Sequence, residues 1–251
     1  MLSNFSINLN VIESYATFLK KNGIKGVFVC GTTGEGALLD VHERKLVLEE
    51  WIKHKSKDFK IISHVGSPSY KSSQDLAIHS QSLKVDAVAT MGPSFFPPSD
   101  VESLIDFCKP IAMGAKNIPF YYYHIPSVSH VKVDMKSFLE KASKSIPNLV
   151  GIKFTHNNYM EFQQCVNFKN GHFEIFNGYE DTLMGGLFPI RSGVVKAMFV
   201  SGILMAATNL LFAALAWSGK SEWLFAVAVL LDLSLIHISE PTRRTLSRMP
   251  S

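Results

Sequence analysis

Short apolar runs alternate with amphipathic stretches along the chain from about residue 10 to residue 187. Each run is rich in β-branched or aromatic residues and is closed by a polar turn. Successive runs begin roughly 24 to 35 residues apart, which fits one strand, one crossover helix and two loops. We therefore expect six parallel strands, at residues 26–30, 61–65, 85–89, 118–123, 149–154 and 173–176.

Amphipathic helices are expected between these strands. Two starts have the spacing of a capping box, Asp40 with Glu43 and Ser99 with Glu102. Strict alternation of strand and helix is compatible with a closed (β/α)8 barrel or an open doubly wound sheet. Apolar residues at near-helical spacing would cover one face of that sheet: Leu46, Leu48, Trp51 and Ile52; Leu104, Ile105, Phe107, Cys108 and Ile111; and, before the first strand, Val11, Ile12, Tyr15, Phe18 and Leu19.

The pattern changes after Leu187. Residues 197–219 carry no charge, a length that exceeds the ~20 residues needed to cross a bilayer. This segment is compatible with a membrane anchor, with a pair of helices buried against the barrel, or with a coding sequence that has left its frame or been joined to foreign sequence. Residues 234–243 resemble translated cloning-adaptor sequence, which favours the last interpretation. We expect a partial barrel domain at residues 1–190 and an atypical apolar tail at residues 191–251.

Charge and cysteine content exclude several classes of protein. The 25 basic and 21 acidic side chains give a net charge of only +4, and no basic stripe interleaved with aromatic residues precedes the last dozen residues, so a nucleic-acid partner is not expected. Cys30, Cys108 and Cys165 lie far apart without metal-ligand spacing, which favours reduced thiols in a cytosolic protein. The N-terminus lacks the features of a signal peptide, and we expect a cytoplasmic protein.

Lys153 is the most informative candidate for chemistry. With a strand period of two it would share a face with Leu149 and Gly151, whereas Val150, Ile152 and Phe154 would pack against helices. A lone lysine near the C-terminal end of such a strand would point into a barrel mouth. Loss of water there favours the free amine, which can attack a carbonyl. The alternative is a lysine that ends the strand and extends to water.

Two further segments end expected strands. Tyr123, one strand before Lys153, can relay a proton, although tyrosines in such a run can also serve packing alone. The loop Gly31–Gly36 offers two hydroxyls, Thr32 and Thr33, and backbone N–H groups that can bind a small carboxylate. It could equally be an ordinary turn. It lacks the spacing of dinucleotide-binding and P-loop motifs, which makes a nucleotide-binding doubly wound sheet the poorer interpretation.

Taken together, Gly31–Glu35, Tyr123–Pro126 and Gly151–Thr155 resemble the N-acetylneuraminate lyase/dihydrodipicolinate synthase family, over about residues 8–187. The resemblance implies a (β/α)8 TIM barrel, usually a homotetramer, that uses neither metal nor organic cofactor. It further implies these roles: Lys153 forms a Schiff base with pyruvate; Tyr123 donates and accepts protons; Thr32 and Thr33 hold the pyruvate carboxylate; Thr155 contacts substrate; and Gly178, Glu180 and Asp181 bind a polyhydroxyl chain.

Within that family, the run Tyr121–Pro126 resembles the sialic acid lyases, and this resemblance implies cleavage of N-acetylneuraminate to N-acetylmannosamine and pyruvate. The stretch Ser127–Ser129 offers no arginine to grip a second carboxylate, which disfavours aspartate semialdehyde as the substrate. Another pyruvate-dependent aldolase of the family is an alternative. A catalytically inactive barrel remnant, membrane-associated through residues 197–219, is a second one.

Three positions depart from the family pattern. A first strand of the type A-x-x-T-P is absent before residue 8. The G-S-T motif of an eighth strand is replaced by Phe188–Arg191. We therefore expect an incomplete barrel, with six strands of eight. In addition, Phe95 occupies the place of a relay tyrosine, so this link of a proton path has no hydroxyl.

Overall fold

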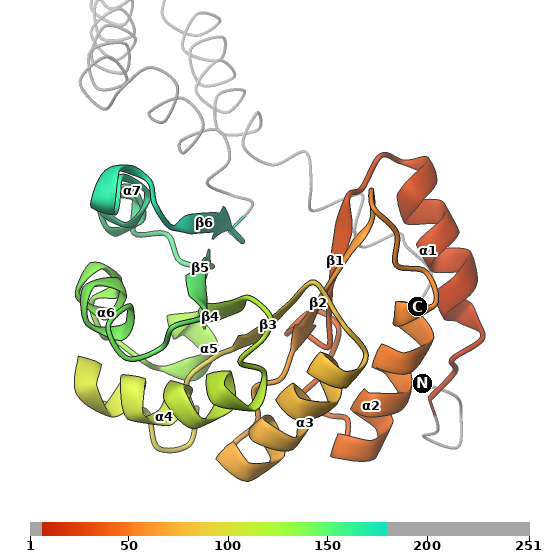
Figure 1. The fold of residues 1–251 in the computed structure, drawn as a ribbon, viewed down its shortest axis with the longest axis horizontal. Helices are drawn as coiled ribbons and strands as arrows, with labels where there is room; N and C mark the ends of the chain where they lie inside the picture. The colour runs from red at the N-terminus through yellow and green to blue at the C-terminus, as the bar shows by residue number, and fades with distance from the viewer. Residues whose placement is uncertain (1–6, 180–251) are drawn as a thin grey trace, which may run out of the picture. The chain divides into compact units, whose positions relative to one another are not determined.

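The structure is a computed structural model that describes residues 7–179 (Figure 1). The chain divides into two compact units, residues 1–178 and 179–251, and all of the described helices and strands belong to the first. These elements are α1 (Val11–Lys21), β1 (Gly26–Val29), α2 (Val41–Ile52), β2 (Lys60–His64), α3 (Tyr70–Ser82), β3 (Ala87–Thr90), α4 (Val101–Gly114), β4 (Phe120–His124), α5 (Pro126–Ser129), α6 (Met135–Ala142), β5 (Leu149–Phe154), α7 (Tyr159–Asn167), the short 3-10 helix η1 (Phe168–Asn170) and β6 (Glu174–Asn177).

The six expected strands are all present and form one parallel sheet in the order β1-β2-β3-β4-β5-β6. Each strand pairs with the next one in the sequence, and the helices between them lie on the outer side of the curled sheet (Figure 1). A doubly wound sheet would reverse its strand order and carry helices on both faces. The barrel class is therefore confirmed, and the open-sheet alternative is wrong.

Two hydrophobic clusters lie on the two faces of the sheet. The large one, between sheet and helices, includes fully buried Leu104, Ile111, Phe120 and Ile152. The small one lies on the inner, concave face and consists of Ala87, Ala89 and Tyr121, with Phe28, Ile62 and Val150 packed against it. The outer cluster holds the helices in place, and the inner face is left for a site.

The pairing between β4 and β5 shifts its register by one residue near the start of the two strands. Phe120 is paired with Leu149, but Tyr121 is paired with Gly151, so that Val150 is the extra residue of a bulge. The expected alternation is therefore wrong at the start of β5: Leu149 joins the outer cluster and Val150 the inner one. Such a shift exchanges the two faces of a strand, because side chains alternate with a period of two.

The two expected capping boxes have different outcomes. At α2 the box is present: Asp40 accepts from the Glu43 backbone N–H, and Glu43 accepts from that of Asp40. At α4 the expectation is wrong, because the N-cap is Asp100, which accepts from the backbone N–H of Ser103 at 2.7 Å. The Glu102 carboxylate instead pairs with Lys141 on α6.

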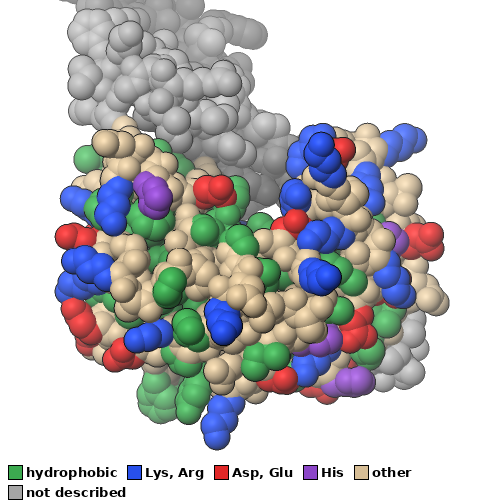
Figure 2. Space-filling view, viewed as in Figure 1, with side chains coloured by type: hydrophobic (Ala, Val, Ile, Leu, Met, Phe, Trp, Pro, Cys, Tyr) green, Lys and Arg blue, Asp and Glu red, His purple; other side chains and the backbone are tan. Residues whose placement is uncertain are grey.

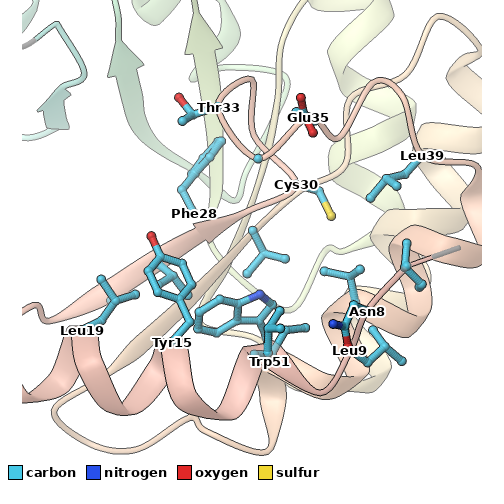
Figure 3. Close-up of a pocket in the computed structure, with 18 of the residues that line it drawn as sticks. Asn8, Leu9, Tyr15, Leu19, Phe28, Cys30, Thr33, Glu35, Leu39 and Trp51 are labelled. Carbon is cyan, nitrogen blue, oxygen red and sulfur yellow. The ribbon is translucent and has the colours of Figure 1, made fainter. Parts of the chain in front are cut away.

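The apolar face expected on the first helix is only partly buried. Ile12 is 7% exposed, but Val11, Tyr15 and Phe18 are each about half exposed. Within residues 7–179, β1 is an edge strand, and no described element packs beyond it. Apolar side chains from α1, β1 and α2 therefore line an open pocket of about 530 Å³ (Figure 3).

Charged side chains of both signs are interspersed on the face of the described region shown in Figure 2. Exposed or half-exposed ion pairs occur among the described residues, such as Lys45 with Asp75 at 2.8 Å. Cys30, Cys108 and Cys165 are buried free thiols, as expected.

Among the helices of residues 7–179, none is both long enough and apolar enough to cross a membrane. The three interpretations of the tail concern residues outside the described region. The segment 197–219 and the stretch Phe188–Arg191 also lie outside it.

Candidate active site

Lys153 and Tyr123 lie side by side at the C-terminal ends of β5 and β4. They are direct partners in the strand register, and the Lys153 Nζ atom lies 3.8 Å from the centre of the Tyr123 ring. Without the bulge at Val150, Tyr123 would instead face Ile152. The register shift therefore turns the lysine to the same inner face as the tyrosine, and the juxtaposition expected from the sequence is present.

Two aromatic side chains that the sequence analysis missed complete the surroundings of this pair. Phe28 on β1 lies 5.2 Å from Tyr123, measured between ring centres, and 4.9 Å from the Lys153 amine. His64, at the end of β2, meets Tyr123 edge to face at 5.6 Å. Both residues lie at or near the C-terminal end of an expected strand, and this position could have marked them as candidates. Tyr123 is 3% exposed, and this packing holds its ring in one orientation.

The phenol of Tyr123 has one hydroxyl partner in the loop after β1. Its oxygen lies 3.2 Å from Thr32 Oγ1, a hydrogen bond in which either group can donate. Thr33 is placed differently, because it lines the apolar pocket between β1, α1 and α2 (Figure 3). The loop therefore brings Thr32 into contact with Tyr123, and it places Thr33 on the wall of the neighbouring pocket.

Thr155 and Gly178 close the other side of the lysine. The Lys153 amine donates to Thr155 Oγ1 at 3.2 Å. Gly178 continues from β6, and its N–H donates to the Phe154 carbonyl at 2.8 Å. A β-carbon on Gly178 would lie 2.2 Å from Thr155 Oγ1 and 3.1 Å from Lys153 Nζ. Glycine is thus required for this close approach. Glu180 and Asp181 lie outside the described residues.

We expect the substitution Gly178→Ala to impair the chemistry of Lys153 without unfolding the sheet. The added methyl group must push Thr155 away, which removes the hydrogen bond that orients the amine. A misplacement of about 1 Å costs roughly 100-fold in the rate of a positioned group. The rate at which pyruvate becomes trapped on the protein by borohydride measures this, and circular dichroism controls for folding. An unchanged trapping rate would show that the contact with Thr155 does not orient the lysine.

A buried polar network supports His64 from behind. The guanidinium of Arg44 donates to the carbonyls of His64 (2.5 Å) and Gly66 (2.8 Å), and His64 Nδ1 lies 2.9 Å from the Cys30 carbonyl. That carbonyl only accepts, so Nδ1 carries the proton. Burial, followed by the positive charge of Arg44, lowers the pKa of His64 to about 3. His64 is therefore a neutral packing partner of Tyr123 at physiological pH.

The concave face contains a cavity of about 610 Å³ with Lys153 on its wall. Its lining is mostly apolar, with Phe28, Ile62 and Phe176 among the residues. Tyr121 donates to the Glu174 carboxylate there, and burial, reinforced by this partner, raises the pKa of the Tyr121 phenol. Within residues 7–179, the single group of three close metal-ligating side chains lies elsewhere, behind β4.

The sheet is parallel and in barrel order, and a lysine amine is held against a tyrosine at the C-terminal ends of two of its strands. These features define a barrel protein with an amine-bearing site in its lumen. The chain belongs to the dihydrodipicolinate synthetase family, whose sequence model matches residues 1–212. It is 43% identical over 214 residues to N-acetylneuraminate lyase A of Xenopus laevis, an alignment that covers 82% of this chain and 70% of the relative.

Solved structures agree with this assignment. The N-acetylneuraminate lyase of Proteus mirabilis matches with a TM-score of 0.72 and 37% identity, over 74% of this chain and 63% of that one. A catalytic lysine mutant of the Ruminococcus gnavus sialic acid aldolase matches with a TM-score of 0.68 and 29% identity, over 72% and 58% of the two chains. This chain thus spans less than two thirds of each of these two structures.

Proposed function

We propose that the protein is a carbon–carbon lyase that cleaves N-acetylneuraminate to N-acetylmannosamine and pyruvate through a Schiff base on Lys153. The observation that carries the proposal is the Lys153 amine, held 3.8 Å from the centre of the Tyr123 ring at the mouth of the barrel. The relatives named N-acetylneuraminate lyase and sialic acid aldolase support the choice of reaction.

The chemistry follows from the placement of these groups. The Lys153 amine attacks the ketone carbon of the sugar acid, and loss of water gives a protonated imine. This imine withdraws electrons from the adjacent carbon–carbon bond as it breaks, so the leaving aldehyde departs while the pyruvate fragment remains as an enamine. Tyr123, hydrogen-bonded to Thr32, is the group positioned to move the protons of these steps. Protonation of the enamine carbon restores the imine, and its hydrolysis then releases pyruvate and regenerates the free Lys153 amine.

The remaining contacts divide between the two ends of the substrate. We assign the carboxylate to Thr32, Thr33 and the backbone N–H groups of their loop, and a further substrate contact to Thr155. Gly178, Glu180 and Asp181 follow β6 in sequence and are assigned to the polyhydroxyl chain. The stretch Ser127–Ser129 lies within α5 and carries no guanidinium, which supports a sugar acid over a substrate with a second carboxylate there.

The proton path starts at Tyr123 and Thr32. Phe95 offers no hydroxyl. Its side chain is 80% exposed, and its ring contacts that of Phe96.

We further propose that the protein acts in the cytoplasm as a homotetramer in sialic acid catabolism, without metal or organic cofactor in the reaction. Buried free thiols are in keeping with a reducing compartment.

Borohydride trapping tests the proposal directly. Incubation of the 251-residue chain with pyruvate and borohydride should convert the imine to a stable N-carboxyethyl adduct, which peptide mapping should locate on Lys153. Incubation with N-acetylneuraminate should give the same adduct and release N-acetylmannosamine. An adduct with pyruvate but no cleavage of the sugar acid would retain the Schiff base and reject the substrate. Absence of an adduct on Lys153 would overturn the mechanism.

A further inference from the structure

A second cluster of side chains lies behind β4, on the opposite face of that strand from Tyr123. It consists of His124 at the end of β4, His156 after β5 and Glu161 in the first turn of α7. Each offers one nitrogen or oxygen atom, and these three atoms lie within 4.8 Å of one another. The two imidazole rings meet edge to face, with centres 5.5 Å apart.

His124 is the unusual member of the cluster. Its side chain is buried, with 2% exposed, and neither ring nitrogen has a hydrogen-bond partner among the described residues. Phe154 and Tyr122 pack around it and supply only aromatic contacts. An imidazole buried without partners costs free energy, because both of its nitrogens have lost their water. A ligand that binds one of the two nitrogens would remove that nitrogen's share of this cost.

Glu161 is held with its carboxylate toward the two imidazoles. One oxygen accepts from the Met135 backbone N–H at 2.8 Å, and the other lies 3.9 Å from His156 Nδ1. The cluster borders an open pocket of about 490 Å³, to which Asp134 and Gln164 also contribute. The pocket gives ions and water access to groups that are otherwise largely covered by protein.

We propose that His124, His156 and Glu161 bind a divalent transition-metal ion of the Zn²⁺ type. Two imidazoles and one carboxylate are a ligand set that Zn²⁺ accepts, with water from the pocket as the fourth ligand. Ligand atoms about 2.0–2.2 Å from zinc lie closer together than 4.8 Å, so side-chain rotations of His156 and Glu161 must close the site. This site is separate from the proposed Schiff-base chemistry and does not depend on it.

Titration of the metal-free, 251-residue chain tests the proposal. ZnCl₂ should bind one to one in isothermal titration calorimetry and raise the melting temperature, since a metal bound only by the folded state stabilises it. CoCl₂ should produce the visible absorption bands of a tetrahedral site. His156→Gln and Glu161→Gln should each weaken Zn²⁺ binding about 100-fold or more, since even outer-shell partners contribute 10- to 100-fold.

The matched control is His79→Gln. His79 on α3 forms a histidine–glutamate pair with Glu49 at 3.2 Å, outside the cluster, and its loss should leave Zn²⁺ binding unchanged. Circular dichroism establishes that the variants fold. If no saturable binding occurs, or if Zn²⁺ binds equally well to the two cluster variants, the three side chains form a packing cluster and the proposal is wrong. Weaker binding after His79→Gln would place the metal elsewhere and also overturn it.

Discussion

Replacement of Lys153 by arginine is expected to abolish both the pyruvate adduct and the cleavage reaction. Arginine keeps the positive charge and much of the length of the side chain, so the aromatic contacts with Tyr123 and Phe28 remain possible. Its guanidinium stays protonated, with a pKa above ~12, and supplies no free amine near neutral pH. Intact-mass measurement after borohydride treatment, together with an assay of pyruvate release, checks this result.

Lys60→Arg is the matched control for this experiment. Lys60 lines the same cavity but lies on β2, where its amine pairs with Asp86 at 3.3 Å. Its replacement should leave the adduct unchanged. Pyruvate-dependent activity that survives in Lys153→Arg, or an adduct that maps to Lys60, would remove the chemical reason to treat this chain as an aldolase.

The placement of Lys153 illustrates how far a sequence pattern can predict a site. Alternation alone put the lysine on the inner face, which is correct, but it put Leu149 there as well, which is wrong. The difference arises at the bulge, where Gly151 lies so close to β6 that a β-carbon would come within 1.8 Å of the Glu174 carbonyl oxygen. The pairing of β5 with β4 and β6 sets this register, and the local sequence of β5 does not predict it.

The fold was more predictable than the details of its loops. The six strands follow from local apolar runs, and their observed boundaries differ from the expected ones by at most two residues. Asp100 rather than Ser99 is the N-cap of α4, and the Glu102 carboxylate expected in the capping box pairs instead with Lys141, 39 residues away. The contact of Thr32 with Tyr123 is also a tertiary contact, because the loop sequence offers two adjacent hydroxyls and does not predict which of them meets the phenol.

His64 and Phe28 were missed because their role depends on the curvature of the sheet. Each looks like an ordinary member of an apolar run, and only the curl of β1, β2 and β4 brings both rings against Tyr123. The network through Arg44 has the same origin, since it joins a helix to the end of a strand 20 residues away. Sequence spacing predicts which residues lie at strand ends, and tertiary packing decides which of them meet.

Because this aromatic packing fixes the ring of Tyr123, Tyr123→Phe isolates the function of the hydroxyl. The ring keeps its contacts with Phe28, His64 and the Lys153 amine, so the pyruvate adduct should still form, although more slowly. Proton transfer loses its donor, and turnover should fall roughly 100- to 10,000-fold. Release of pyruvate from N-acetylneuraminate, and exchange of the pyruvate methyl protons with deuterium followed by NMR, measure the two steps separately.

Two companion variants decide what that loss means. Tyr122→Phe removes a phenol from the neighbouring residue, whose buried side chain belongs to the outer cluster, and it should leave turnover unchanged. Thr32→Val keeps the Tyr123 phenol but removes its partner at 3.2 Å, and its turnover should lie between those of the parent and of Tyr123→Phe. If Tyr123→Phe turned over as fast as the parent, the tyrosine would serve packing alone. The protons would then have to move through another group, and Thr33 with a water molecule would be the first to test by substitution.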